Sequence, residues 1–353
     1  KVRLETRVPQ LAKIVYHNKL GTQLERAERV QLLAGQIARA IGADALLAER
    51  AAWLAKADLV TNMVGEFPEL QGIMGRYYAT GDGEDPRVAM AIEQHYQPRF
   101  AGDRLPEDGV AVAVALADKL ETLVGMFGIG QQPSGDKDPF ALRRHALGVV
   151  RILVERGLEV SLAKLADAAF SVFPQDMIGN AGTELIAFIL DRLRAYLRDA
   201  GYSVNEIEAV LCMNPEWLAP IPRQLAAVRA FAGMPEAASL AAANKRVANI
   251  LRQAAAKGES FANASAAEML EDAELKLFDA LTEASRIATP LFKDGDYTGY
   301  LKTFAVLKAP VDAFFDSIMV MVDDPAVRRS RLALLHDLRH EMNRVADISK
   351  LSA

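Results

Sequence analysis

The chain has 353 residues, 51% of them hydrophobic and 25% charged, with a formal net charge of -5. This length allows about two or three domains with sizeable cores, and this composition excludes a disordered chain. The acidic balance gives no overall attraction to nucleic acid, so any RNA binding must come from local basic surfaces.

Three features of the sequence indicate the cellular compartment of the protein and whether the chain is a fragment. The single cysteine, Cys212, excludes an internal disulfide framework, and the longest apolar run, 110–117, is too short to cross a membrane. We therefore expect a cytoplasmic protein with no membrane partner. Because the chain starts at Lys1 and 2–12 has no signal pattern, we interpret it as a fragment that lacks an N-terminal half.

Apolar periodicity predicts helices throughout the first third of the chain. We expect two helical stretches within 8–42, a mostly buried helix over 45–65, a turn and short helix over 68–78, and a helix over 86–96. The segment 110–117 alternates Val and Ala like a strand, but its extension to Phe127 follows helical spacing, which predicts one long helix. The Gly- and Pro-rich segment 128–139 predicts a domain boundary near residue 135.

The remaining two thirds are also predicted to be helical. Helices are expected over 139–156, 161–173, 183–200, 223–232, 236–257, 297–308, 310–322 and 325–348, with another that opens on a capping box from Ser265 to Glu268. Three prolines within 213–222 predict a second boundary. No convincing strand is found. The fold class is therefore predicted to be all-α, with domains at 1–135, 136–218 and 219–353.

Several long strings of this sequence resemble one known family. VTNMVGEFPELQGIMGRYYA at 60–79, ADKLETLVGMFGIG at 117–130 and DPFALRR at 138–144 resemble the C-terminal half of the beta subunit of bacterial glycyl-tRNA synthetase, the two-subunit type. The segments 243–251 and 314–339 are similar to DALR-type anticodon-binding domains. The resemblance implies an HD-like helical domain, then a helical connector, then an anticodon-binding helical bundle.

The same resemblance sets expectations for activity and partners. The whole enzyme attaches glycine to tRNA, with ATP and Mg used at the alpha subunit, so this chain is expected to hold no catalytic residue and no cofactor. The implied partners are glycine tRNA and the alpha subunit, in an assembly of two alpha and two beta subunits, with no DNA.

One acidic residue in the predicted central helix, Asp58, needs an explanation, because a buried carboxylate needs a partner. HD-type domains hold a metal through two histidines and two aspartates, and the resemblance places Arg26, Ala57, Asp58 and Asp118 at those positions. Without imidazole ligands two carboxylates are too few, so we predict a degenerate site without metal.

We expect Asp58 and Asp118 to be buried anions that pair with Arg26, Lys56 or Lys119. The alternative is a surviving metal-dependent phosphohydrolase, in which His17 or His95 would serve as an additional ligand.

The last predicted helix has a basic face. Asp324 can cap it and Pro325 can occupy its first position. The side opposite its apolar stripe carries Arg328, Arg329, His336, Arg339, His340 and Asn343. Arginine planes pair with phosphate and stack on unpaired bases, so this face is a candidate RNA-binding surface, as are Lys245 and Arg246. A merely solvated outer face is the alternative.

Two further expectations concern single arginines, and a third concerns the function of the whole chain. Arg331 falls inside the apolar stripe, so we predict that it is buried and paired with an acid such as Asp316. Arg143 and Arg144, which follow a predicted helix cap at Asp138, either contact the tRNA backbone or clamp the first domain to the helices that follow. A helical scaffold that only docks other proteins is the third functional class.

Overall fold

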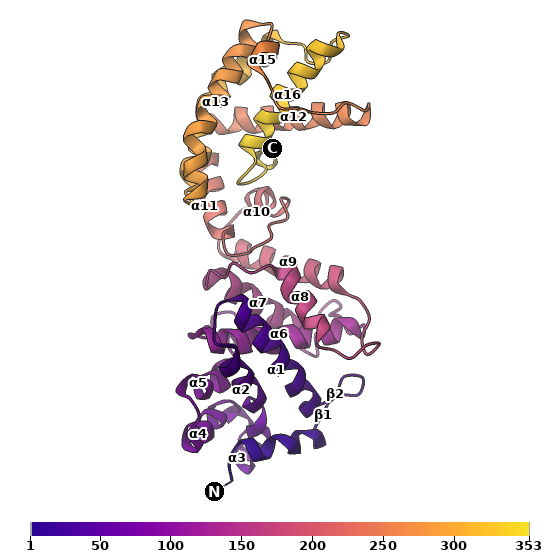
Figure 1. The fold of residues 1–353 in the computed structure, drawn as a ribbon, viewed down its shortest axis with the longest axis vertical. Helices are drawn as coiled ribbons and strands as arrows, with labels where there is room; N and C mark the ends of the chain where they lie inside the picture. The colour runs from indigo at the N-terminus through magenta and orange to yellow at the C-terminus, as the bar shows by residue number, and fades with distance from the viewer. Residues whose placement is uncertain (1, 353) are drawn as a thin grey trace. The chain divides into compact units, whose positions relative to one another are not determined.

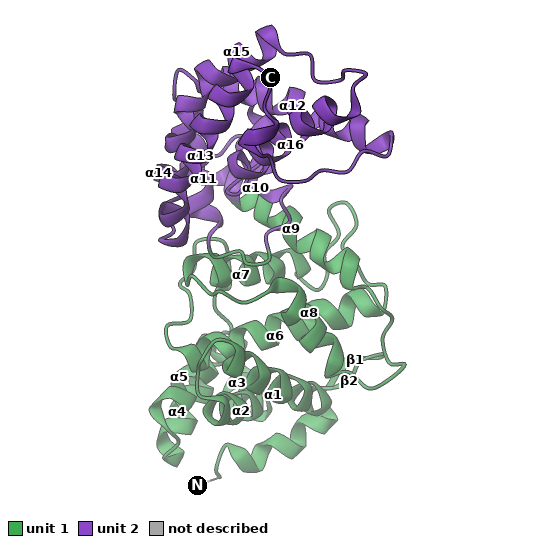
Figure 2. Ribbon diagram, turned by 45° about the horizontal axis from the view of Figure 1, so that its top comes forward, with its two compact units in different colours: residues 1–196, 216–219 green, residues 197–215, 220–353 purple. Residues whose placement is uncertain are grey.

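The computed structural model describes residues 2–352, which form two compact units (Figures 1 and 2). Unit 1 contains the residues up to 196 together with 216–219, and unit 2 contains 197–215 and the residues from 220 onward. The predicted division near residue 135 lies inside unit 1, whereas the second predicted boundary, 213–222, overlaps the change of unit.

The all-α prediction is confirmed, but the expectation of no strand is wrong. β1 (Val15–His17) pairs antiparallel with β2 (Gly21–Thr22) in the part of the chain where two helical stretches were predicted. The remaining elements of unit 1 are helical. They are η1 (Glu5–Lys13), α1 (Gln23–Ala40), α2 (Ala45–Leu54), η2 (Ala57–Val60), α3 (Asn62–Glu66), η3 (Pro68–Leu70), α4 (Ile73–Asp82), α5 (Pro86–Gln94), α6 (Gly109–Gly128), α7 (Leu142–Glu155), α8 (Leu162–Ser171) and α9 (Gly182–Asp199), the last of which crosses into unit 2.

Helix α6 is the centre of unit 1. Every residue from 110 to 127 is buried, because α1, α2, α5, α7 and α8 pack around it. Asp108 caps its start by accepting a hydrogen bond from the Val110 amide at 2.8 Å. The prediction of one long helix here is confirmed, and its complete burial places Asp118, Lys119 and Glu121 in the interior.

The single helix predicted over 45–65 is instead broken into three parts. Helix α2 ends at Leu54, and a 3-10 turn, η2, precedes the short helix α3. The Thr61 hydroxyl donates to the Asp58 carbonyl at 2.6 Å and accepts from the Val64 amide at 3.3 Å. Thr61 therefore caps a new helix where apolar spacing alone predicted continuity, and Asp58 lies in the turn.

Unit 2 is a bundle around the aromatic side chains of Tyr300, Phe304 and Phe314, all of which are buried. Its further elements are α10 (Val204–Leu211), α11 (Ile221–Ala232), α12 (Ala237–Ala256), η4 (Ala266–Glu268), α13 (Asp272–Lys293), α14 (Tyr297–Thr303), η5 (Phe304–Leu307), α15 (Lys308–Ser317), α16 (Pro325–Met342) and η6 (Ile348–Leu351). The predicted capping box at Ser265 is wrong, because Ser265 makes no capping hydrogen bond. The helix begins later, where the Glu274 carboxylate accepts from the Leu270 and Glu271 amides.

A pH-dependent contribution to stability is expected from Glu206 in α10. Its carboxylate accepts hydrogen bonds from Arg229 at 2.8 and 3.0 Å, and these bonds lower the pKa of Glu206 to about 2. A lowered folded-state pKa gives stability that is present above the unfolded value near 4.5 and is lost as the pH falls toward 2.

The variant Glu206→Gln should therefore unfold at a lower temperature than the wild type at pH 6. This gap between the two unfolding temperatures should become steadily smaller from pH 4.5 to pH 2.5. Thermal unfolding followed by circular dichroism measures this gap. A gap that stays constant over this range would contradict the assignment.

Candidate nucleic-acid interface

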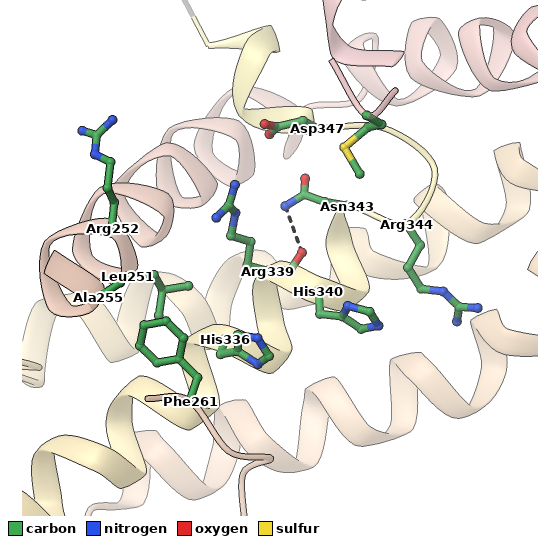
Figure 3. A pocket seen from close by; sticks show the side chains of 11 residues that line it. Leu251, Arg252, Ala255, Phe261, His336, Arg339, His340, Asn343, Arg344 and Asp347 are labelled. Atoms are coloured by element: carbon green, nitrogen blue, oxygen red, sulfur yellow. Dashed lines mark hydrogen bonds between the residues drawn. The ribbon is translucent and has the colours of Figure 1, made fainter. Parts of the chain in front are cut away.

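Unit 2 contains a cavity of about 520 Å³, seen from close by in Figure 3. Its lining comes from α12, α16, the loop between α12 and η4, and the segments that follow α10 and α16. The lining residues are Met213, Leu251, Arg252, Ala255, Phe261, His336, Arg339, His340, Asn343, Arg344 and Asp347. The cavity thus combines apolar walls with guanidinium and imidazole groups.

The start and the packing of α16 determine which of its side chains reach this cavity. Asp324 accepts hydrogen bonds from the Ala326 and Val327 amides, as predicted from the sequence. The helix then buries an apolar stripe that includes Leu334, Leu335 and Leu338. Because side chains three and four residues apart share a face, His336, Arg339 and His340 line the cavity together.

An aromatic pair forms one wall of the cavity. The rings of Phe261 and His336 are stacked, with centroids 5.5 Å apart and an interplanar angle of 22° (Figure 3). The Asp337 carboxylate accepts a hydrogen bond from the Ala264 amide at 2.8 Å and so ties the loop that carries Phe261 to α16. A flat base could extend this stack, because ring faces attract other π systems.

The charges around the cavity are mainly positive. Arg252, Arg339 and Arg344 are its three guanidinium groups, whereas Asp347 is its one carboxylate. Within residues 2–352, Arg339 has no carboxylate in ion-pair range, and Arg344 lies 3.8 Å from Glu341. The unpaired guanidinium of Arg339 beside the stacked rings is suited to holding phosphate and unpaired bases.

The predicted RNA-binding residues divide between the cavity and its surroundings. His336, Arg339 and His340 line the cavity, but Arg328 is half-buried in an ion pair with Glu259 at 2.7 Å. Arg329 is exposed and does not line the cavity.

Lys245 and Arg246 are exposed on α12 and also lie outside the cavity lining, with Arg246 placed 4.2 Å from the centroid of the Phe315 ring. Asn343 was predicted to be exposed, and this is wrong. It is buried, because its amide exchanges hydrogen bonds of 2.9 and 3.0 Å with Asn244.

Among the lining residues with a cationic or aromatic side chain, the sequence reasoning missed Arg252, Phe261 and Arg344. Arg252 could have been found, because it follows Lys245 by seven residues and so falls on the same side of α12. Phe261 lies in a loop without periodicity, so no local pattern indicates its position.

Arg331 is buried, as predicted, but its predicted partner is wrong. Its guanidinium pairs with Glu274 of α13 instead of Asp316 and also donates to the Met319 carbonyl at 2.8 Å. The Glu274 side chain is almost fully buried, so this pair joins two helices of the unit 2 core.

In unit 1, buried charges lie where the degenerate metal site was predicted. Asp118 lies 2.9 Å from Arg26 and 3.2 Å from Lys56, and Glu121 accepts from Arg26 at 2.8 Å and from Arg29 at 2.9 Å. Burial alone would raise the pKa of Asp118, but the charges of Arg26 and Lys56 outweigh it and hold the pKa well below its usual value. The predicted pairing of Asp118 is confirmed.

The prediction that Asp58 pairs with a cationic side chain is wrong. Its Oδ2 accepts backbone hydrogen bonds from Gly72 at 2.6 Å and Gly75 at 3.0 Å. Gly72 has a φ of +81°, which other residues rarely adopt, and this backbone turn aims its amide at the carboxylate. Burial raises the pKa of Asp58, and the preceding residue, Ala57, is buried without any polar side chain.

The histidines do not complete a metal site. His95 Nδ1 lies 2.7 Å from the Ile92 carbonyl and Nε2 lies 2.8 Å from the Lys56 ammonium. Because a carbonyl only accepts, Nδ1 carries the proton and Nε2 accepts from Lys56, which leaves no free ligand nitrogen. His17 accepts from the Lys19 amide in the β1–β2 hairpin.

A guanidinium and an ammonium thus contact Asp118, and neither group binds cations. Residues 2–352 contain no cluster of three His, Cys, Asp or Glu side chains that could hold a metal. The donor set therefore does not fit a metal-dependent phosphohydrolase.

The basic segment that opens α7 has a defined cap. Asp138 accepts from the Leu142 and Arg143 amides at 2.8 and 2.9 Å, and Arg143 donates to the Gly135 carbonyl. Arg144 is exposed beside the half-buried His145, whose pKa burial lowers to about 4. Contact of Arg143 and Arg144 with tRNA stays a prediction.

Comparison with known proteins agrees with the helical fold. Residues 240–351, which include most of α12, all of α16 and most of the cavity lining, match the family described as DALR anticodon binding domain. Residues 1–212 match the family described as glycyl-tRNA synthetase beta subunit. Over the part of the chain that the structure describes, no helix is long and apolar enough to cross a membrane.

Curated relatives match the whole chain. Proteins named glycine–tRNA ligase beta subunit are 59% identical in Thiobacillus denitrificans, 57% in Paracidovorax citrulli and 55% in Methylobacillus flagellatus. Each alignment covers 100% of this chain but only 49 to 50% of the relative, so the chain spans about half the length of these proteins.

The helical fold agrees with the similarity of residues 240–351 to DALR anticodon-binding domains. The chain belongs to the glycyl-tRNA synthetase beta subunit family, whose model matches more than half of its residues.

Proposed function

We propose that this chain is the tRNA-binding portion of a glycine–tRNA ligase beta subunit and that unit 2 holds unpaired bases of the anticodon loop. The observation that carries the proposal is the cavity beside α16, where the Phe261–His336 stack lies next to the unpaired guanidinium of Arg339. RNA loops are commonly recognised by such stacking and guanidinium contacts. The family membership supports the proposal that this RNA is tRNA.

The proposal extends to the whole enzyme. Attachment of glycine to tRNA would use ATP and Mg at the alpha subunit, in a cytoplasmic assembly of two alpha and two beta subunits. This chain would contribute binding and no catalytic residue. The charge cluster of unit 1 would be an HD-like site in which ion pairs with Arg26 and Lys56 have replaced metal ligands.

Two single variants separate the expected roles of the cavity residues. Phe261→Ala removes a stacking partner, so the affinity for glycine tRNA should fall by roughly five- to a hundredfold with an unchanged salt dependence. Arg339→Ala removes a cationic contact, so the affinity should fall about tenfold and the slope of log K against log salt should decrease by about one. Fluorescence anisotropy at 50 and 200 mM salt measures both quantities.

The matched control is Arg286→Ala, because Arg286 is an exposed arginine of α13 that pairs with Glu283 away from the cavity. It should bind glycine tRNA like the wild type. If Phe261→Ala and Arg339→Ala also bind like the wild type, the cavity is not the RNA-binding site.

A further inference from the structure

Unit 1 contains a second polar cavity, which takes no part in the proposed anticodon binding by unit 2. It has a volume of about 240 Å³ and lies beside α6 and α7. Its lining residues are Gln71, Tyr96, Pro98, Arg99, Asp118, Lys119, Ala141, Arg144 and His145. It adjoins the buried charge cluster, because Asp118 belongs to both.

Three cations line this cavity without a carboxylate partner. Within residues 2–352, Arg99, Lys119 and Arg144 form no side-chain ion pair. The one carboxylate of the lining, Asp118, is already compensated by Arg26 and Lys56. The cavity therefore presents a net positive charge that the protein itself does not neutralise.

Lys119 is the buried cation of this cavity, because it is only 3% exposed. Its ammonium donates to the His95 carbonyl at 3.2 Å and has no carboxylate within 4 Å in the described chain. Its aliphatic stem passes Gly148 of α7, where a Cβ atom would lie 2.6 Å from the Lys119 Cε. A buried ammonium without a counter-ion is costly, and here the backbone of α7 leaves room for it.

We propose that this cavity binds a phosphate dianion, either inorganic phosphate or the terminal phosphate of a small monoester. Lys119 would contact it from the buried end, and Arg99 and Arg144, both exposed, would contact it from the solvent side. Arginine forks and ammonium groups form strong charge-assisted hydrogen bonds with phosphate oxygens. The uncharged ring of His145 can donate one more. The site is independent of RNA binding by unit 2.

Calorimetric titration of the purified chain with inorganic phosphate, at constant ionic strength in chloride, tests the proposal. The wild type should bind and should unfold at a higher temperature with phosphate, because a ligand that binds only the folded state stabilises it. Lys119→Met should bind at least tenfold more weakly, and without phosphate it should be no less stable than the wild type. Wild-type protein that does not bind phosphate, or Lys119→Met with unchanged affinity, would overturn the proposal.

A second variant protects the test against misfolding of Lys119→Met. Arg144→Gln alters an exposed side chain and should weaken phosphate binding about tenfold. The matched control is Arg143→Gln, which removes the same charge one residue earlier, outside the cavity lining, and should bind like the wild type. Equal losses in both variants would show a general charge effect and would overturn the proposed site.

The source of the phosphate is resolved by three probes. Adenosine monophosphate should bind, adenosine should not, and a dinucleoside monophosphate, which carries only a singly charged diester, should bind at least tenfold more weakly than adenosine monophosphate. If only inorganic phosphate binds, the ligand is the free ion. If the diester binds as well as the monoester, the cavity recognises an RNA backbone and the proposed monoester site is wrong.

Discussion

Glu121→Gln will lower the free energy of unfolding of unit 1 by about 3–5 kcal/mol, because it removes one partner of a buried ion-pair network. The Glu121 side chain is 0% exposed and accepts from both Arg26 and Arg29. After the substitution the buried guanidinium of Arg29 has no carboxylate within ion-pair range in the described chain. Urea denaturation followed by circular dichroism measures the change.

The control for this result is Glu49→Gln. Glu49 forms an exposed pair with Arg39 at 3.4 Å in the same unit, and such pairs contribute about 0–1 kcal/mol. A loss for Glu121→Gln no larger than that for Glu49→Gln would show that the network does not hold α1 against α6.

Arg331→Met should destabilise unit 2 by a similar amount, about 3–5 kcal/mol, because it leaves Glu274 buried without a cation. It also removes the hydrogen bond to the Met319 carbonyl. Adding Glu274→Gln to Arg331→Met should recover part of the loss, since the neutral amide needs no cation and its oxygen can still accept from the Leu270 and Glu271 amides. Denaturant unfolding of the single and double variants gives both values.

A matched arginine three residues earlier provides the comparison. Arg328 pairs with Glu259 at 2.7 Å but remains about one-fifth exposed, so Arg328→Met should cost less than Arg331→Met. An equal cost, or a double variant less stable than Arg331→Met alone, would contradict the assigned role of the buried pair.

Helix positions could be predicted from the sequence where one periodic pattern persisted. The spacing from Leu116 to Phe127 correctly outweighed a strand-like alternation in α6, and Asp324 with Pro325 correctly marked the start of α16. Apolar spacing wrongly predicted one continuous helix over 45–65. The hydrogen bond by which Thr61 caps a new helix is local and does not show in apolar spacing.

The contacts of the site residues were harder to predict, since the groups that they contact are distant in sequence. Burial of Arg331 follows from its place in the apolar stripe, but its choice of Glu274 over Asp316 depends on how α13 packs. Asp58 was expected to need a cation, yet two backbone amides satisfy its Oδ2. Phe261 lies in a loop that Asp337 ties to α16, and no local pattern indicates this contact.

Binding of this chain to glycine tRNA, beside the same tRNA with its anticodon bases changed, tests the central claim most directly. The proposal predicts tighter binding of the native anticodon at both low and moderate salt, and loss of that preference in Phe261→Ala and Arg339→Ala. Equal, weak binding of both tRNAs at both salt concentrations would contradict anticodon recognition by unit 2.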